Sequence, residues 1–187
     1  MENRKNLIIW GAKGQLQVLS EFLDEEFKIC GLIDNNIKIK SPFEGVPIFH
    51  NELDFLDFYS DLKSDCYYIV AIGGERGKDR EEIGSFFSKH KLKPISAIHD
   101  SAIIAKNARL GESVQVMMGV CIAAKCDIGD SVIINTSASI DHECTIEKGC
   151  HIAPGAKLAG KVTIGEYSFI GTGAIILGGV TIGEGAL

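Results

Sequence analysis

The segment Asp141-His142-Glu143 places one histidine between two acidic residues. A carboxylate beside an imidazole can orient the ring, fix its tautomer and raise its basicity, which suits the ring to act as a general base near neutral pH. The other interpretation of the same residues is a histidine exposed on a surface turn. The local spacing favours neither interpretation over the other.

Residues with little or no side chain recur at a fixed sequence spacing from this histidine. Gly160 and Gly178 follow His142 by 18 and 36 residues, and Ala124 precedes it by 18 residues. If residues 18 apart lie side by side, His142 borders a groove and not a wall of side chains. Such a groove can admit a thioester, and the backbone N–H of Gly160 is a candidate donor to the oxyanion of an acyl-transfer reaction.

A six-residue repeat supplies the 18-residue spacing. An aliphatic residue stands at every sixth position from Ile98 to Ile182, and a small residue follows each one four positions later. This period fits neither a helix nor a simple strand, and it is typical of hexapeptide solenoids, in which three hexads complete one triangular coil. Coils that pair like parallel strands lie about 4.8 Å apart and bring residues 18 apart together.

The first half of the chain has a different pattern, in which strands and helices alternate. We expect strands at 7–10, 29–33 and 67–72, and helices at 16–23, 51–58 and 79–90. This alternation predicts a small parallel α/β sheet and a domain boundary near residue 96.

A glycine-containing turn, Gly11-Ala12-Lys13-Gly14, leaves the first of these strands and opens a helix. Backbone N–H groups in such a turn can hold a phosphate. Asp34 ends the second strand, where dinucleotide-binding domains place an acid that contacts ribose. The dinucleotide fingerprint is incomplete, because its G-x-G spacing is absent and Leu16 replaces its last glycine. A nucleotide or nucleotide-sugar pocket, a purely structural turn and a nicotinamide site therefore all stay open.

Composition narrows the class of protein. The 187 residues are 45% hydrophobic and 24% charged, with a net charge of −6. A chain this apolar folds, but it has no run of about 18 apolar residues that would span a membrane. The acidic balance argues against nucleic-acid binding. The short first strand follows a mixed-charge start and does not resemble a signal peptide, so we expect a cytoplasmic protein.

A zinc site shared between subunits is the main alternative role for the histidines. His142 and His151 could supply two ligands, but His99 is two coils away and no residue of the repeat supplies the third. The sequence therefore predicts no metal.

These motifs together resemble a known family. The chain has G-A-x-G after its first strand, L-I-D after its second and hexads containing N-T-S-x-S-I-x-H-E-C. It is similar to bacterial sugar acyltransferases of the left-handed β-helix superfamily, which include UDP-4-amino-sugar and GDP-perosamine N-acetyltransferases and sialic acid O-acetyltransferases. The resemblance is most specific between Asn135 and His151. It implies a Rossmann-like nucleotide-sugar-binding domain over 1–96, followed by a left-handed parallel β-helix of hexapeptide repeats over 97–187.

The resemblance also implies a role for individual residues. His142 matches the general base, Glu143 the glutamate that polarises it, and His151 a contact to acetyl-CoA. Thr172 lies by register along the pantetheine groove. The nucleotide-sugar contacts match Lys13, Gly14, Gln15, Asp34, Asn35 and Gly73. Family members are homotrimers with active sites between neighbouring subunits.

The chain departs from the family pattern in two places. The usual G-A-x-G-H-G lacks its histidine and last glycine here, since Gln15 and Leu16 stand in their places. The chain also stops at Leu187 without the expected further coil and G-V-P-A tail. Because solenoids need caps, we expect either a truncated sequence or another element over the last coil.

The sequence thus predicts an acetyl-CoA-dependent N-acetyltransferase that acts on an amino group of a nucleotide-linked aminosugar. In this mechanism His142 is the base, Glu143 steadies the imidazolium and the Gly160 amide stabilises the oxyanion. The alternatives are a sugar O-acetyltransferase, a nicotinamide-binding protein that uses its solenoid only for oligomerisation, and a non-catalytic trimeric nucleotide-binding scaffold.

Overall fold

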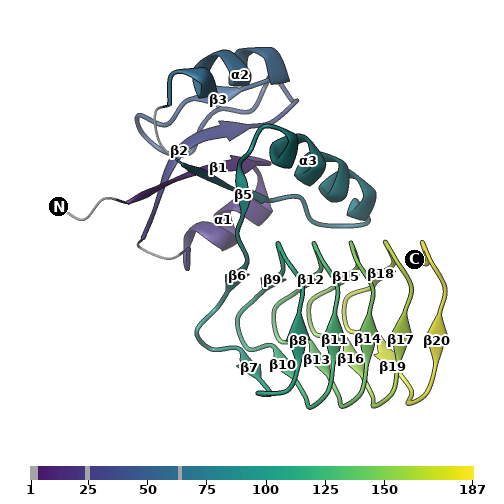
Figure 1. Cartoon of the computed structure of the whole chain (residues 1–187). Coiled ribbons are helices and arrows are strands. Elements are labelled where there is room, and N and C mark those ends of the chain that lie inside the picture. Colours follow the sequence, from purple (N-terminus) through teal and green to yellow (C-terminus); the bar gives the residue numbers. More distant parts are fainter. Residues whose placement is uncertain (1–3, 24–25, 63–64) are drawn as a thin grey trace. The chain divides into compact units, whose positions relative to one another are not determined.

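The structure is a computed structural model that describes residues 4–23, 26–62 and 65–187. The chain divides into two compact units (Figure 1). Unit 1 comprises Met1–Ile72 and Ile83–Ile95, and unit 2 comprises Gly73–Glu82 and Ser96–Leu187. The segment Gly73–Glu82, which the sequence pattern groups with the first domain, therefore packs with the coils of unit 2.

Unit 1 contains a five-stranded sheet in which every strand pair is parallel. The strand order is β3-β2-β1-β4-β5. These strands are β1 (Lys5–Trp10), β2 (Phe27–Ile33), β3 (Ile48–Phe49), β4 (Cys66–Val70) and β5 (Lys93–Pro94). The helices among the described residues are α1 (Gly14–Ser20), α2 (Glu52–Ser60) and α3 (Gly77–Lys89). The predicted parallel sheet is confirmed, and the two short edge strands β3 and β5 are additions to it.

The core of unit 1 follows from the apolar runs of its central strands. A parallel sheet covered on both faces needs continuous hydrophobic segments, and Leu7, Ile8 and Ile9 of β1 are fully buried. Phe55 of α2 and Phe87 of α3 complete the core. Helix α2 begins where predicted, because the side chain of its N-cap residue accepts a hydrogen bond from a backbone N–H of the first turn.

Unit 2 is a parallel β-helix built from two-residue strands. Three five-stranded sheets form its sides, with the orders β19-β16-β13-β10-β7, β20-β17-β14-β11-β8 and β18-β15-β12-β9-β6. The strands are β6 (Ala97–Ile98), β7 (Ile103–Ile104), β8 (Arg109–Leu110), β9 (Gln115–Val116), β10 (Cys121–Ile122), β11 (Asp127–Ile128), β12 (Ile133–Ile134), β13 (Ser139–Ile140), β14 (Thr145–Ile146), β15 (His151–Ile152), β16 (Lys157–Leu158), β17 (Thr163–Ile164), β18 (Phe169–Ile170), β19 (Ile175–Ile176) and β20 (Thr181–Ile182). Paired residues are 18 apart, as Cys121 and Ser139 are, so the predicted coil length is confirmed.

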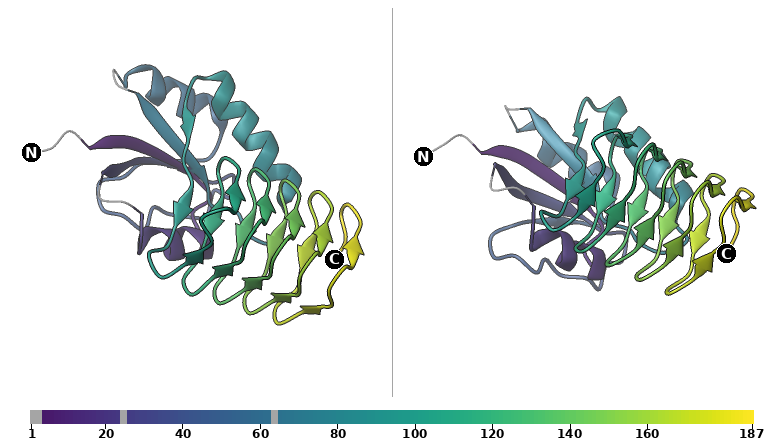
Figure 2. Two further views of the ribbon diagram at one scale, coloured as in Figure 1. Left: turned by 60° about the horizontal axis from the view of Figure 1, so that its bottom comes forward. Right: turned by 90° about the horizontal axis from the view of Figure 1, so that it is seen from below.

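The repeated aliphatic residues fill the interior of this β-helix. Val116, Ile134 and Ile152 are fully buried, as the hexad pattern predicts. Ile98 in the first coil is 43% exposed, since a terminal coil has a neighbour on one side only. Figure 2 shows the coils of unit 2 stacked one upon another in sequence order.

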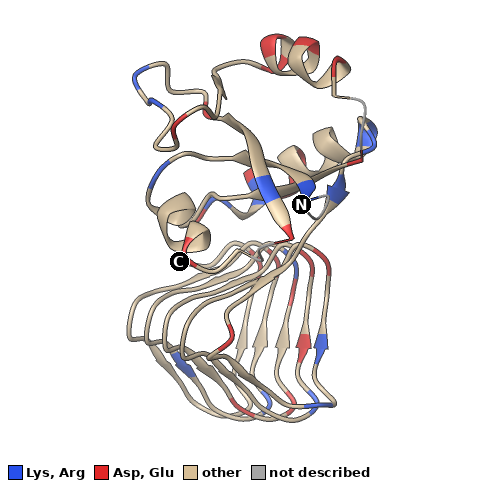
Figure 3. Ribbon diagram, turned by 90° about the vertical axis from the view of Figure 1, so that its left-hand side faces the viewer, with Lys and Arg blue, Asp and Glu red and all other residues tan. Residues whose placement is uncertain are grey.

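Charged residues of both signs are interspersed along the chain (Figure 3). This distribution agrees with the moderate net charge of −6. Among the described helices, none combines the length and the apolar character that crossing a bilayer requires.

Candidate active site

His142 lies on a turn of unit 2 between strands β13 and β14, next to the acid that contacts its ring. Its Nδ1 lies 3.0 Å from Oε2 of Glu143. A carboxylate oxygen accepts the hydrogen bond, so Nδ1 carries the hydrogen and Nε2 of the neutral ring keeps its lone pair. Glu143 adopts a left-handed backbone conformation with φ of 59°. With this geometry, Nε2 is the ring nitrogen that can accept a proton.

The two acids beside His142 have different roles. The hydrogen bond to His142, followed by the nearby charge of Lys161, holds the pKa of Glu143 below its usual range, so the carboxylate is ionised at neutral pH. Asp141 instead accepts a 2.8 Å hydrogen bond from the backbone N–H of His142 through Oδ1. Asp141 therefore fixes the turn, whereas Glu143 orients the ring.

Gly160 lies directly against the imidazole, as the 18-residue period predicts. A Cβ atom placed on Gly160 would lie 2.5 Å from Nε2 and 2.6 Å from Cε1 of His142. The carbonyl of Gly160 accepts a hydrogen bond from the N–H of Gly179, but within the described residues its own N–H donates to no partner. The ring of His142 and an available backbone donor thus lie side by side.

A groove on the β19-β16-β13-β10-β7 face extends from this point. It encloses about 330 Å³, and its lining includes Asp141 and Ala159, the sequence neighbours of His142 and Gly160. The face around it is apolar, because Ile103, Ile175 and Leu177 are 69%, 75% and 72% exposed. A long, partly apolar ligand or a second protein surface can be accommodated here.

His151 is buried in unit 2, with both ring nitrogens engaged. Nδ1 lies 3.1 Å from the carbonyl of Gly74, and Nε2 lies 3.1 Å from Nδ2 of Asn135. The carbonyl accepts, so Nδ1 carries the hydrogen and Nε2 accepts from the amide. Burial lowers the pKa of His151 to about 4, and the ring is neutral at pH 7. A ligand could bind either ring nitrogen only by replacing one of these hydrogen bonds.

Two other predicted site residues lie in unit 2. Thr172 is exposed on a turn of the coils. Gly73 is half-buried and immediately precedes Gly74, whose carbonyl contacts the His151 ring. The structure therefore brings Gly73 close to His151, a proximity that the repeat does not reveal.

Arg80 is a structural residue of this region that sequence reasoning missed. Only 1% of it is exposed, and its guanidinium donates hydrogen bonds to the carbonyls of Ser131, Gly149 and Cys150 at 3.1, 2.6 and 3.2 Å. Burial lowers its pKa to about 10, so it remains charged at pH 7. Arg80 therefore attaches the segment Gly73–Glu82 to the coils. In the sequence it is one of several charged residues of a predicted helix, so nothing there distinguishes it.

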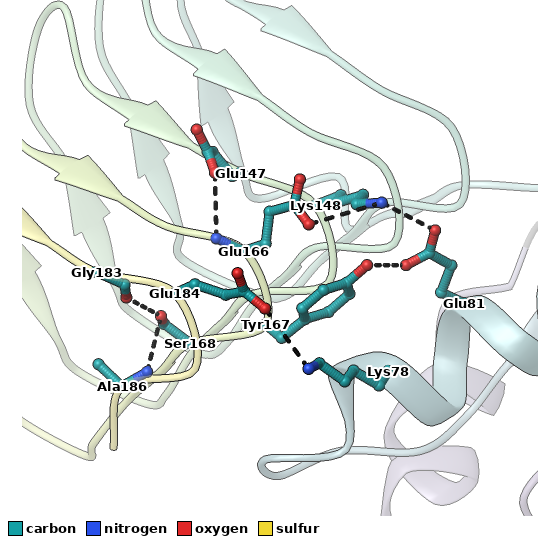
Figure 4. A network of polar contacts seen from close by, with 10 residues as sticks. All are labelled: Lys78, Glu81, Glu147, Lys148, Glu166, Tyr167, Ser168, Gly183, Glu184 and Ala186. Carbon is teal, nitrogen blue, oxygen red and sulfur yellow. Dashed lines mark hydrogen bonds and ion pairs between the residues drawn. The ribbon is translucent and has the colours of Figure 1, made fainter.

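A polar network extends this attachment (Figure 4). Lys148 lies 3.0 Å from Glu81 and 3.6 Å from Glu166, and the hydroxyl of Tyr167 donates to Glu81. The hydrogen bond from Tyr167, together with the hydrogen bond and the charge of Lys148, holds the pKa of Glu81 below its usual range. These contacts, like those of Arg80, position the backbone that carries Gly74.

The remaining predicted residues lie in unit 1, at the carboxyl ends of β1 and β2. Lys13 and Gly14 are exposed and Gln15 is half-buried at the start of α1. Asp34 accepts a 3.1 Å hydrogen bond from the N–H of Ala12, which joins the two turns. Asn35 follows and is exposed.

The first turn requires glycine at Gly11. Its φ is 104°, and a Cβ atom there would collide with the carbonyl of Ala71. Close approach of the turns after β1 and β4 therefore explains this residue. Within the described residues, the structure has no cluster of three or more His, Cys, Asp or Glu side chains arranged to hold a metal ion.

Solved structures of several acetyltransferases are similar to this chain. A histidine-to-asparagine variant of perosamine N-acetyltransferase from Caulobacter crescentus, in complex with CoA and GDP-perosamine, shares 35% identity with a TM-score of 0.82, over 96% of this chain and 83% of that one. The acetyltransferase domain of PglB from Neisseria gonorrhoeae FA1090, in complex with acetyl coenzyme A, shares 28% identity with a TM-score of 0.82, over 98% and 87%.

A more distant structure, WeeI from Acinetobacter baumannii AYE, is 20% identical with a TM-score of 0.71, over 97% of this chain and 94% of that one. At this identity the likeness concerns the fold alone. No protein-family description and no curated protein sequence matches the chain.

Proposed function

The chain belongs to the sugar acetyltransferase family of the Caulobacter crescentus perosamine enzyme, and we propose that it transfers the acetyl group of acetyl-CoA to an amino group of a nucleotide-linked aminosugar. One observation carries this proposal: the ring of His142, held by Glu143, lies directly against the side-chain-free backbone of Gly160. The similar Caulobacter crescentus structures hold CoA and GDP-perosamine as ligands of those proteins.

The proposed reaction is an acyl transfer with His142 as general base. The sugar amine attacks the thioester carbonyl, and Nε2 of His142 takes the proton that the nitrogen loses as the N–C bond forms. Glu143 stabilises the imidazolium through the 3.0 Å contact at Nδ1. The N–H of Gly160 donates to the oxyanion. The C–S bond then breaks, and the imidazolium returns its proton to the departing sulfur of CoA.

The groove beside His142 is the proposed path of the pantetheine arm. Its apolar lining suits an extended chain with few charges. Thr172 and His151 remain the candidates for contact with acetyl-CoA. For His151, a contact at a ring nitrogen would displace the hydrogen bond to Gly74 or to Asn135.

Unit 1 is the proposed Rossmann-like domain that holds the nucleotide part of the substrate. Its strand order changes direction at β1 and β4, and ligands of open parallel sheets bind beyond the carboxyl ends of the strands at such a switch point. Lys13, Gly14 and Gln15 lie there, together with Asp34 and Asn35. Gly73, which belongs to unit 2, remains a candidate contact of the nucleotide sugar.

A homotrimer is the proposed assembly. The exposed Ile103, Ile175 and Leu177 form an apolar face of the kind that a neighbouring copy covers. Light scattering of the purified chain tests this assignment, with a mass three times 20.2 kDa as the expected result. We also propose that the enzyme works in the cytoplasm, where acetyl-CoA is available.

The reaction is tested by following thiol release from acetyl-CoA in the presence of GDP-, UDP- and CMP-linked aminosugars. The variant His142→Ala is expected to lower kcat by about 10²–10⁴-fold, the usual contribution of a general base. His99→Ala, which changes another histidine of the β-helix, is the matched control and should be fully active. An active His142→Ala enzyme contradicts the mechanism. A product that loses acetate in mild alkali identifies an ester and thus an O-acetyltransferase.

A further inference from the structure

His50 lies at the carboxyl-end edge of the unit 1 sheet, directly after β3. In the sequence no acid stands beside it in a helpful register, which is typical of a surface residue. In the structure its Nδ1 lies 2.7 Å from the backbone carbonyl of Asp34, and the residue is half-buried. The N–H of Asp34 in turn donates to the carbonyl of Phe49 at 3.0 Å. The turns after β2 and β3 are thereby joined.

The contact with Asp34 fixes the chemistry of the ring. A carbonyl oxygen can only accept a hydrogen bond, so Nδ1 of His50 carries the hydrogen. Nε2 of the neutral ring is then an acceptor with a lone pair. Within the described part of the chain, Nε2 has no hydrogen-bond partner. The ring of His50 therefore presents Nε2 as an oriented hydrogen-bond acceptor at the carboxyl-end edge of the sheet.

The strand order places this acceptor in line with the candidate nucleotide contacts. From β1 to β3 the edge carries the Gly11–Gly14 turn, then Asp34, then His50. Neighbouring strands are about 4.8 Å apart, so β3 lies about 10 Å from β1. With the diphosphate near the Gly11–Gly14 turn, a span of this size reaches past the ribose to the base.

We propose that His50 binds the nucleoside of the substrate, with Nε2 accepting a hydrogen bond from an N–H of the base or an O–H of the ribose. This inference rests on the proposed nucleotide-binding function of unit 1. Guanine and uracil both present a ring N–H of the required kind. The same side chain also braces Asp34, so its two nitrogens have separable roles.

Two substitutions separate these roles in calorimetric titrations of the full chain with GDP, UDP and CMP. His50→Asn keeps an N–H donor near the position of Nδ1 but removes Nε2, and we expect affinity for the bound nucleotide to fall about 10-fold. His50→Gln places an amide oxygen near the position of Nε2 and should recover part of the loss. Wild-type affinity in His50→Asn overturns the inference, because bracing of Asp34 would then explain the histidine fully.

Modified nucleotides identify the donor. The wild-type protein is titrated with diphosphates of 1-methylguanosine and 3-methyluridine, which lack the ring N–H, and with the 2′-deoxy nucleotides. We expect one of these changes to weaken wild-type binding about 10-fold and to have no further effect in His50→Asn. Losses that add independently in every case overturn the inference.

A wild-type chain that binds none of GDP, UDP and CMP overturns the proposed nucleotide-binding role of unit 1 together with this inference. Nucleotide binding that is insensitive to His50 overturns the inference alone. The thermal unfolding midpoint of His50→Asn should match that of the wild type, which shows that the measured change concerns binding.

Discussion

Replacing Gly160 by alanine should slow the enzyme strongly while leaving its fold unchanged. The new Cβ atom would lie 2.5 Å from Nε2, 2.6 Å from Cε1 and 3.1 Å from Cδ2 of His142, well inside ordinary contact of 3.4–4 Å. The backbone of Gly160 is not in the left-handed region, so alanine fits its conformation. The side chain of His142 is 51% exposed, and the ring can therefore move away without disturbing the interior.

The size of the loss follows from the distance that the ring must move. Nε2 has to withdraw by about 1 Å to restore ordinary contact, and this motion pulls Nδ1 away from Glu143. A misplacement of about 1 Å can cost about 10²-fold in rate, which corresponds to about 2.7 kcal/mol of transition-state stabilisation. We therefore expect kcat of Gly160→Ala to fall about 10²-fold. The backbone N–H of residue 160 remains, so the loss measures base placement and not oxyanion binding.

The assay is thiol release at saturating acetyl-CoA, together with thermal unfolding of each variant. Gly183→Ala is the matched control, because a Cβ atom there meets no atom within 4 Å, and it should retain full activity. If Gly160 acts through His142, adding Gly160→Ala to His142→Ala causes no further loss. Full activity of Gly160→Ala, or an additive loss in the double variant, refutes the reasoning.

Three further predictions concern the residues around this centre. Glu143→Gln should lower kcat about 10–100-fold with an unchanged unfolding midpoint, because the imidazolium loses its charged partner. Arg80→Met should lower the free energy of unfolding by about 2–4 kcal/mol in urea titrations, because buried carbonyls lose their donor, whereas Lys78→Ala should cost at most about 0.5 kcal/mol, since its ion pair is exposed. His151 has a folded pKa of about 4, below the value near 6.5 of an unfolded histidine, so its contribution to stability is present above pH 6.5 and decreases as the pH falls. Between pH 6.5 and 5 this amounts to about 2 kcal/mol, which His151→Gln should abolish in urea titrations at the two pH values.

Each of these has a contradicting outcome. Wild-type kcat in Glu143→Gln would show that the ring needs no charged partner. Equal unfolding free energies for Arg80→Met and Lys78→Ala would remove the special role of the buried guanidinium. An unchanged pH dependence in His151→Gln would mean that the ring is solvated in the folded state.

The exact period of the hexads explains why the centre of the site could be predicted. Parallel coils bring together residues 18 apart, so the contact between His142 and Gly160 follows from counting. The same counting identifies Ile134 and Ile152 as interior residues, which the structure confirms. This counting works because all coils share one register. Once one interior position is identified, the six-residue period therefore gives the interior positions of every coil.

Contacts that do not follow the 18-residue spacing of the coils could not be predicted in this way. Arg80 donates to the carbonyl of Gly149, and His151 contacts that of Gly74, so each contact joins a residue that precedes the repeat to one within it. The partners are backbone atoms, which have no residue-specific signal. The hydrogen bond between His50 and the carbonyl of Asp34 could not be predicted for the same reason, because the side chains next to His50 in the sequence give no sign of it.

The β-helix separates chemistry from stability. The line of turn positions through Ala124, His142 and Gly160 lies outside the packed interior, whereas Ile140 and Cys144 on either side of the histidine are buried and hold the coil. A reactive side chain can therefore occupy one layer of that line while the adjacent layers stay bare, and the interior packing is the same with or without it. Turn substitutions at His142 and Gly160 should change the rate alone, and substitutions of buried polar residues such as Arg80 should change stability first.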